Sequence, residues 1–268
     1  MASSFLDPTV LLDPAGSWST AHFIGFAALV QVGFEIYVQL LPTIFGGATP
    51  LSPRGKHLDT LETLDKSFIL FNRLAVIMMT YHYLMLVVYS PRVAWRLDAI
   101  SAANTLLALP TCFIAYDLPY SLFHRLLHVR GLYAYVHKHH HRQIVPTRGN
   151  TDAINVHPFE FLCGEYNHLF AVWATSYLCG SIHALTTVLF VFSGGFLASL
   201  NHTRFGVRLS VPLPKALGSE VVLFDVRAHD VHHRIPQSNY GQYTMFWDKL
   251  MGSFREYEVT HPRDKKAS

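Results

Sequence analysis

The chain is poor in charged residues. Asp, Glu, Lys and Arg together make up 15% of its 268 residues, half of the residues are hydrophobic, and the formal net charge is only +3. A nucleic-acid-binding protein would carry basic arms, or basic stretches interleaved with aromatic residues, and this sequence has neither. We therefore expect no nucleic-acid partner. The composition favours one compact membrane domain over one or two soluble domains.

Cysteines and cofactor-binding motifs are also scarce. The three cysteines, Cys112, Cys163 and Cys179, lie in or beside apolar stretches and form no CxxC pair. A disulfide framework or an iron–sulfur site is therefore not expected. The sequence also has no glycine-rich dinucleotide fingerprint and no HPGG-type haem segment. Any redox chemistry must draw its electrons from another protein.

Long hydrophobic runs dominate the first half of the chain. Residues 23–41 contain one charge, Glu35, and residues 68–89 contain one charge, Arg73, whereas residues 102–116 are uncharged. As a helix, each run can cross about 30 Å of hydrocarbon, the third only with its flanking residues. These runs predict three membrane-spanning helices.

A fourth apolar segment is too long for a single span. Residues 166–200 contain no Asp, Glu, Lys or Arg, and one straight helix of this length would reach about 52 Å. We expect a helical hairpin that turns near Cys179-Gly180-Ser181. The predicted fold class is all-α, an integral membrane bundle with four to five transmembrane helices. An unusually apolar soluble bundle is the alternative.

Histidine is the residue in excess, with 17 in the chain. On a helix, positions i, i+3 and i+4 lie within an arc of about 60°, so each HxxHH box would point its three imidazoles the same way. Structural zinc needs only four ligands, so eight clustered histidines fit two metal ions, and neutral imidazole suits iron, zinc and copper. Soluble di-iron proteins combine glutamates with Glu-x-x-His motifs on a four-helix bundle, whereas these boxes would supply nearly all-nitrogen ligation. The clustered histidines form three boxes: His124 and His128; His137, His140 and His141; His229, His232 and His233.

The three boxes read HRLLH, HKHHH and HDVHH, and in this order after apolar helices they resemble the fatty acid hydroxylase/sterol desaturase superfamily. The similarity covers roughly residues 100–258. It includes the segment 239–253 after the last box, and the segments 155–160 and 201–202 between the second and third boxes. On this basis we expect N-terminal membrane anchor helices in residues 1–100, a catalytic domain in residues 101–258 and a basic tail in residues 259–268.

The resemblance implies a membrane-embedded, non-haem di-iron enzyme that uses O2 to hydroxylate or desaturate a lipid C–H bond. Its cofactors would be two iron ions, which zinc can replace in isolated protein, and its electrons would come from an external cytochrome b5 or NAD(P)H reductase. The lipid would be sterol-like or fatty-acyl. The metal ligands implied are the eight box histidines, with two further histidines as ligands or supporting groups, His157 and His202.

Three polar residues are predicted to support the ligands. Asp117 lies two helical turns before His124 on the same face, where its carboxylate could accept an N–H from a ligand and fix its tautomer. A charge at the membrane boundary is the alternative interpretation. Asp230 lies inside the third box but off its ligand face, and Asn201 directly precedes His202.

Other polar residues near the boxes have two readings. Glu160 or Glu165 could orient a ligand, but a polar helix start explains them equally well. His139 lies off the common face of its box and is expected to be solvent-exposed or to support a ligand. Five further histidines are interpreted as packing or interfacial residues: His22, His57, His82, His168 and His183.

The distribution of positive charge predicts the topology. The histidine-bearing regions, about 124–161 and 201 onward, must meet to build one site and so share a side of the membrane. Fifteen of the 21 Lys and Arg residues lie after residue 120, and positive segments remain cytoplasmic. We therefore expect a cytosolic metal site and C-terminus. The final residues 265–268, KKAS, resemble a dilysine retrieval signal, which predicts a multi-pass protein of the endoplasmic reticulum; a plain basic tail is the alternative.

Two other functional classes compete with the oxidase. A metal transporter would place ionisable ligands near the bilayer midplane on broken helices, whereas these boxes lie outside the most apolar stretches. A non-catalytic membrane protein that binds metal or lipid is the second alternative. The intact boxes argue against it.

Overall fold

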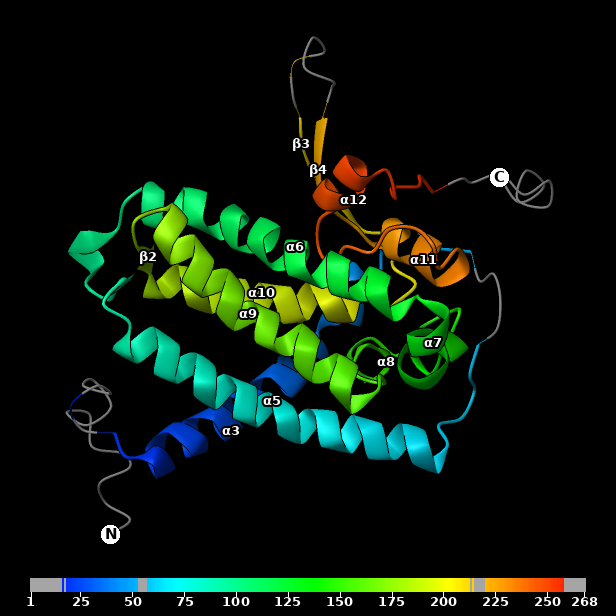
Figure 1. The fold of residues 1–268 in the computed structure, drawn as a ribbon, viewed down its shortest axis with the longest axis horizontal. Coiled ribbons are helices and arrows are strands. Elements are labelled where there is room, and N and C mark those ends of the chain that lie inside the picture. The colour runs from blue at the N-terminus through cyan, green and yellow to red at the C-terminus, as the bar shows by residue number, and fades with distance from the viewer. Residues whose placement is uncertain (1–15, 17, 53–56, 213, 215–219, 258–268) are drawn as a thin grey trace.

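The computed structural model describes residues 16, 18–52, 57–212, 214 and 220–257, and it confirms an all-α bundle. The predicted basic tail and the dilysine motif lie outside these residues. In Figure 1 the long helices run side by side, and the short helices gather at one end. The long helices are α3 (Thr20–Val38), α5 (Thr63–Tyr89), α6 (Ala108–Leu127), α9 (Pro158–Leu178) and α10 (Ala184–Asn201).

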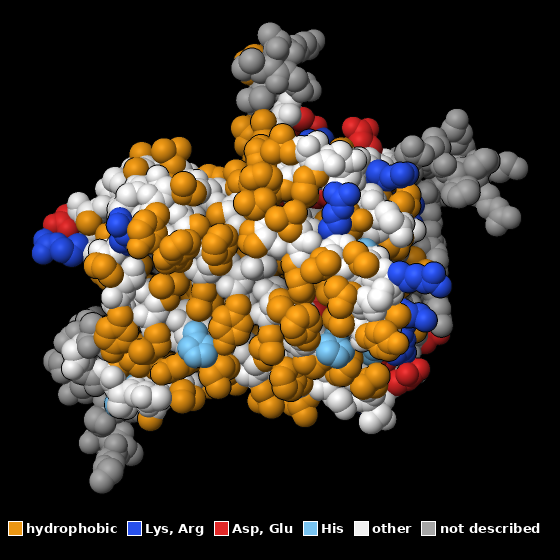
Figure 2. Space-filling view, in the orientation of Figure 1, with side chains coloured by type: hydrophobic (Ala, Val, Ile, Leu, Met, Phe, Trp, Pro, Cys, Tyr) orange, Lys and Arg blue, Asp and Glu red, His pale blue; other side chains and the backbone are white. Residues whose placement is uncertain are grey.

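Four helical segments are long and apolar enough to cross a membrane, as the hydrophobic runs predict. The first joins α3 to the short helix α4 (Leu41–Phe45), and the third joins the π-helix η3 (Ala103–Leu107) to α6. Hydrophobic side chains cover the visible face over these helices, while Lys and Arg gather mainly at the end that holds α7 and α11 (Figure 2). The chain is therefore a multi-pass membrane protein. The four segments are Thr20–Phe45, Thr63–Tyr89, Ala103–Leu127 and Ala184–Asn201.

The predicted helical hairpin is confirmed as α9 and α10. Gly180 adopts φ +78° in the turn, a conformation that glycine reaches without steric cost. The ring of His183 then caps α10 by accepting a hydrogen bond from the backbone N–H of Leu185 (3.1 Å). Helix α9 begins earlier than the uncharged segment, at Pro158, because proline suits the first helical position.

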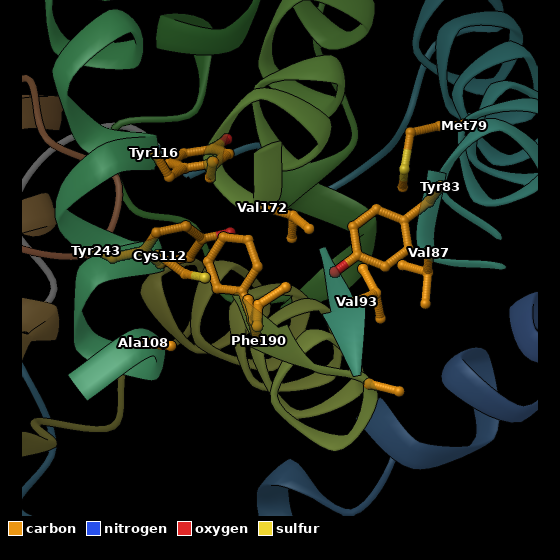
Figure 3. Close-up of a cluster of buried hydrophobic side chains, with 13 residues drawn as sticks. Met79, Tyr83, Val87, Val93, Ala108, Cys112, Tyr116, Val172, Phe190 and Tyr243 are labelled. Atoms are coloured by element: carbon orange, nitrogen blue, oxygen red, sulfur yellow. The ribbon is translucent and has the colours of Figure 1, made fainter. Parts of the chain in front are cut away.

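A cluster of buried aromatic and aliphatic side chains joins α5, α6, α9 and α10 (Figure 3). Phe190 of α10 meets the rings of Phe113 and Tyr116 from α6 edge-on. The hydroxyl of Tyr83 on α5 donates to the carbonyl of Thr187 on α10 (2.9 Å). Because lipid tails are as apolar as these side chains, close packing and buried hydrogen bonds hold the helices together.

Short elements connect and follow the long helices. The antiparallel pair of β3 and β4 was not expected from the sequence, and it projects from one side of the bundle (Figure 1). A two-residue parallel pair, β1 (Val93–Ala94) and β2 (Ile182–His183), lies with the 3-10 turn η2 (Leu97–Ala99) at the end of the bundle opposite the histidines. The remaining elements are α7 (Arg130–Leu132), η4 (Tyr133–His137), η5 (His140–Arg142), α8 (Asn150–Ala153), β3 (Arg208–Pro212), β4 (Glu220–Asp225), α11 (Val226–Arg234) and α12 (Phe246–Met251).

Candidate metal centre

Nine histidines gather into two groups at one end of the bundle. In each group, one ring nitrogen from every histidine lies within 4.8 Å of those of the others. The structure thus brings together all eight box histidines and adds His202, the C-cap residue of α10. Group one consists of His124, His128, His137, His141 and His232, and group two consists of His140, His202, His229 and His233.

Each of the two HxxHH boxes divides its histidines between the two groups. His137 ends the π-helix η4 and His140 begins the 3-10 helix η5, so the second box does not follow a regular α-helix. The third box lies on the α-helix α11, yet it too contributes to both groups, with His232 in group one and His229 in group two. The two groups are neighbours, and the second and third boxes each supply histidines to both of them.

The ring nitrogens are spaced as ligands of a shared ion would be. In group one, the Nε2 atoms of His124 and His141 lie 3.0 and 2.9 Å from Nε2 of His137. In group two, Nε2 of His229 lies 3.0 Å from Nε2 of His233. Two nitrogens bound to one ion at about 2.1 Å, with an angle between them of 90–110°, would be about 3.0–3.4 Å apart.

The opposite nitrogen of several rings is held by a backbone carbonyl. His124 Nδ1 lies 2.8 Å from the carbonyl oxygen of Tyr240, and His232 Nδ1 lies 2.7 Å from that of Ser238. A carbonyl can only accept, so each Nδ1 carries the proton and each Nε2 keeps its lone pair. Lone pairs that face one another at about 3 Å repel unless a cation lies between them. The donor set therefore fits metal ions.

Glu160 supports group one directly. Its Oε1 atom lies 2.7 Å from Nδ1 of His137, and both side chains are buried. Glu160 therefore fits both interpretations, because it also lies in the first turn of α9. Glu165 contacts His168, which belongs to neither group. His139 also lies outside both groups, where its ring contacts buried polar side chains of α5 and of the segment before α9.

Burial and neighbouring imidazoles keep the histidines neutral. They lower the pKa of His128 to about 3, and they hold the pKa values of His140, His229 and His233 well below the usual value of 6.5. Desolvation is the largest cause in each case, followed by the other histidines of the site. Neutral imidazole is the form that binds metals, so the groups are prepared for metal binding over the ordinary pH range.

Asp117 does not accept a hydrogen bond from a ligand histidine, contrary to expectation. Its buried carboxylate instead accepts the backbone N–H groups of Gln242, Tyr243 and Thr244, at 3.0, 3.1 and 2.5 Å. This loop follows Tyr240, whose carbonyl holds His124. The carboxylate thus acts on the metal centre one step away, by fixing the loop.

Asp248 fixes the same loop from the other side. Its side chain is fully buried and accepts the backbone N–H groups of Tyr240 and Gly241, both at 2.8 Å. Asn239 lies between Ser238 and Tyr240, whose carbonyls hold histidines of group one. It adopts φ +53°, and its side-chain amide donates to the carbonyl of Ala228 (3.0 Å). The segment 238–244 is therefore a backbone scaffold for group one, which the sequence did not reveal.

In the described part of the chain, the side chains of Asn201 and Asp230 form no hydrogen bond or ion pair with the grouped histidines. The amide of Asn201 donates to the carbonyl of Gln242 (2.9 Å), which adds a third anchor to the scaffold. Asp230 forms ion pairs with Arg204 (2.6 Å) and Arg234 (3.0 Å). Both residues support the surroundings of the metal centre rather than a ligand.

The structure does not bring His157 to either group. It is the N-cap residue of α9, where its Nδ1 accepts the backbone N–H of Phe159 (3.2 Å), and its ring packs against Phe68. The nitrogen that a ligand would need is engaged in starting the helix. We do not include His157 in the proposed ligand set.

A cavity of about 130 Å³ leads from the helices to the histidines. Residues of α3, α5, α6, α9 and α10 line it, and it ends at both groups. Tyr166, Phe170 and Trp173 of α9 do not line it, and Phe170 and Trp173 are exposed. The aromatic lining comes instead from Tyr116, Tyr120 and other residues that the sequence did not single out. The histidines that reach the cavity are His124, His137, His140, His202 and His229.

Comparison with known proteins places these features in a family. Protein CER1-like 2 of Arabidopsis thaliana is 29% identical over 169 residues, which are 60% of this chain and 25% of that protein. The Delta(7)-sterol 5(6)-desaturase of Eremothecium gossypii is 31% identical over 142 residues, 52% of this chain and 35% of the desaturase. Methylsterol monooxygenase 1 of Rattus norvegicus is 25% identical over 155 residues, 58% of this chain and 49% of that enzyme.

The chain spans half or less of the length of these three relatives. No solved structure matches it significantly. The model of the family described as fatty acid hydroxylase matches residues 109–253, more than half of the chain. All nine grouped histidines, Glu160 and the scaffold 238–244 fall within the matched residues. The chain therefore belongs to the fatty acid hydroxylase family.

Proposed function

We propose that the protein is a membrane-bound, non-haem di-iron oxidase that uses O2 to hydroxylate or desaturate a C–H bond of a lipid. One iron ion would lie in each histidine group. The observation that carries the proposal is the cavity, because it joins the apolar helices to both groups and so offers a lipid carbon a path to the metal centre. The names of the relatives, two of them sterol enzymes, support this reaction class.

The protein itself would hold the metal ions, orient the rings that bind them and shield the reacting carbon from water. Bound iron, once reduced, would supply the power to activate O2 and oxidise an unactivated C–H bond. Carbonyl groups and Glu160 keep the proton of the ligand rings on the nitrogen that faces away from the metal, as in His124 and His137. The buried walls of the cavity exclude water from the reacting carbon.

The substrate would enter from the bilayer and the electrons from the cytosol. A sterol-like or fatty-acyl lipid suits the apolar lining. Lys and Arg gather at the histidine-bearing end (Figure 2), where they would favour an acidic redox partner such as cytochrome b5, or an NAD(P)H reductase. The same positive charge supports a cytosolic orientation for this end and the C-terminus, and the sterol-enzyme relatives support a location in the endoplasmic reticulum membrane. Protease access to a C-terminal tag in sealed microsomes tests that orientation.

The reaction is tested with isotopic oxygen. Membranes that contain the protein and a reductase system are supplied with ¹⁸O2, and their lipids are compared with those from a His140→Ala/His232→Ala variant, which lacks one ligand in each group. Hydroxylation would add ¹⁸O to a lipid, and desaturation would remove two hydrogens, in the wild type only. Identical lipids in both samples, with iron bound to the wild type, would favour a non-catalytic metal- or lipid-binding protein or a metal transporter.

A further inference from the structure

A polar cluster interrupts the apolar wall of the cavity. Glu35 of α3 and Arg73 of α5 form an ion pair (3.1 Å between Oε1 and Nε) that joins two candidate membrane spans. Gln31 and Asn150 each donate an amide N–H to the same Glu35 oxygen, at 3.1 and 3.3 Å. Charged groups at such positions are costly and usually mark a substrate path. Gln31, Arg73 and Asn150 line the cavity.

Gln31 has an acceptor without a partner. Its side chain is 8% exposed, and its Nε2 is held by Glu35. A carboxylate can only accept, so the amide nitrogen must face Glu35 and the orientation of the amide is fixed. Its carbonyl oxygen, Oε1, is buried and bonds to no group in the described part of the chain. Because an unpaired buried carbonyl is unfavourable, this atom calls for a hydrogen-bond donor.

We infer that this cluster binds the hydroxyl group of the lipid substrate. The O–H would donate to Oε1 of Gln31, and the guanidinium of Arg73, which uses only its Nε on Glu35, has further N–H groups to donate to the hydroxyl oxygen. The inference rests on the proposed function, and it narrows the substrate to lipids that already bear an alcohol.

A fatty carboxylate fits the cluster less well than an alcohol. Arg73 is already neutralised by Glu35, so an additional carboxylate would bring an unbalanced negative charge into a cavity whose lining is largely apolar. An ionised carboxylate also has no proton to donate to Gln31. A neutral hydroxyl can donate to Oε1 of Gln31, and it leaves the charge balance between Glu35 and Arg73 unchanged.

Gln31 and Arg73 line the cavity from α3 and α5, and His124 and His137 line the same cavity. With its hydroxyl at Gln31, a lipid would extend along the cavity and place a different carbon near the histidines. The oxidised carbon is therefore not the carbon that carries the alcohol.

Binding is measured on the metal-loaded protein in detergent without any reductant, so that turnover plays no part. Two matched pairs serve as probes: cholesterol with 5-cholestene, its 3-deoxy analogue, and octadecan-1-ol with octadecane. For at least one pair, the ratio of alcohol affinity to hydrocarbon affinity should be about fivefold higher in the wild type than in a Gln31→Met variant. Taking the ratio between proteins cancels the different partitioning of alcohol and hydrocarbon into detergent. Gln39→Met alters an exposed glutamine at the end of the same helix, and this control should keep the preference.

Three results would overturn the assignment. They are a wild type without preference in either pair, a preference that survives in Gln31→Met, and stearate that binds more tightly than octadecan-1-ol. If Gln31→Met does not fold, Gln31→Asn, whose shorter amide withdraws the acceptor, should show the same loss. Since these measurements need no oxidation, an alcohol preference without any lipid product would sink the proposed oxidase and leave the binding site standing. Lipid products without an alcohol preference would support the oxidase and overturn the hydroxyl-binding site.

Discussion

The carboxylate of Glu160 lies 2.7 Å from Nδ1 of His137, although the two residues lie on different helices. His137 is central to group one, because its Nε2 atom is close to those of both His124 and His141. One buried carboxylate thus fixes the ring around which the other ligands are arranged. Contacts of this kind behind a ligand commonly matter nearly as much as the ligand itself.

Replacement of Glu160 by alanine should weaken iron binding by group one. We expect a loss of about 10- to 100-fold in affinity, because the ring of His137 loses the partner that sets its orientation and tautomer. Iron retention during titration with a chelator measures the effect. Glu165→Ala on the same helix is the control, since Glu165 contacts neither group. Equal iron retention by both variants would contradict the role given to Glu160.

The scaffold can be tested through Asp248. Asp248→Asn keeps the size of the side chain but replaces one of the two acceptors that hold the N–H groups of Tyr240 and Gly241. We expect a loss of about 1–3 kcal/mol in stability, seen as a lower melting temperature, together with preferential loss of the group-one iron. Asp98→Asn, an exposed position, should change neither. A variant as stable as the wild type with full iron would show that the scaffold is not needed.

Acidification should release the metals and destabilise the fold. The pKa values of His140, His229 and His233 are held well below 6.5, whereas in the unfolded chain they return to about 6.5. Below that pH the unfolded state binds more protons than the folded state, so stability is full above about pH 6.5 and falls as the pH drops. The slope is at most about 1.4 kcal/mol per pH unit for each histidine.

Melting temperature and bound iron measured between pH 7.5 and 5 check this prediction. The His140→Ala/His232→Ala variant should show a shallower dependence, because two of the depressed histidines are gone. A wild type whose stability and iron content stay constant over this range would count against the neutral, buried histidines described above.

Filling the cavity should block turnover without removing iron. Gly164 of α9 lines the cavity, and a Cβ there would meet the ring of Tyr120 at an ordinary 3.5 Å. Gly164→Ala should therefore be tolerated. Gly164→Leu should reduce product formation at least tenfold while both irons remain, because the added side chain occupies the space of the lipid. Normal product formation by the leucine variant would mean that the substrate lies elsewhere.

The membrane helices and the ligand histidines could be predicted because their signals are local. A long uncharged run identifies a span, and HxxHH spacing identifies a box, without knowledge of the rest of the fold. The scaffold of group one could not be predicted in this way, since the carbonyl that holds His124 belongs to Tyr240, 116 residues later. For the same reason Asp117 was paired with a nearby histidine, although its partners come from Gln242 to Thr244.

The division of the boxes between two groups also escaped sequence reasoning. A regular helix was assumed for the second box, but a π turn ends at His137 and a 3-10 turn begins at His140. Backbone irregularities of this kind are common at functional sites and have no reliable sequence signal. His157 shows the converse, a histidine in a family-like segment that the fold uses to cap α9.

Iron stoichiometry tests the central claim most directly. Elemental analysis of the purified protein should find about two irons per chain in the wild type. His232→Ala, which alters group one, and His140→Ala, which alters group two, should each retain about one iron, and the double variant should retain none. A wild type that binds one iron or none after iron supplementation, or single variants that lose both ions equally, would contradict two separate histidine-bound metal sites.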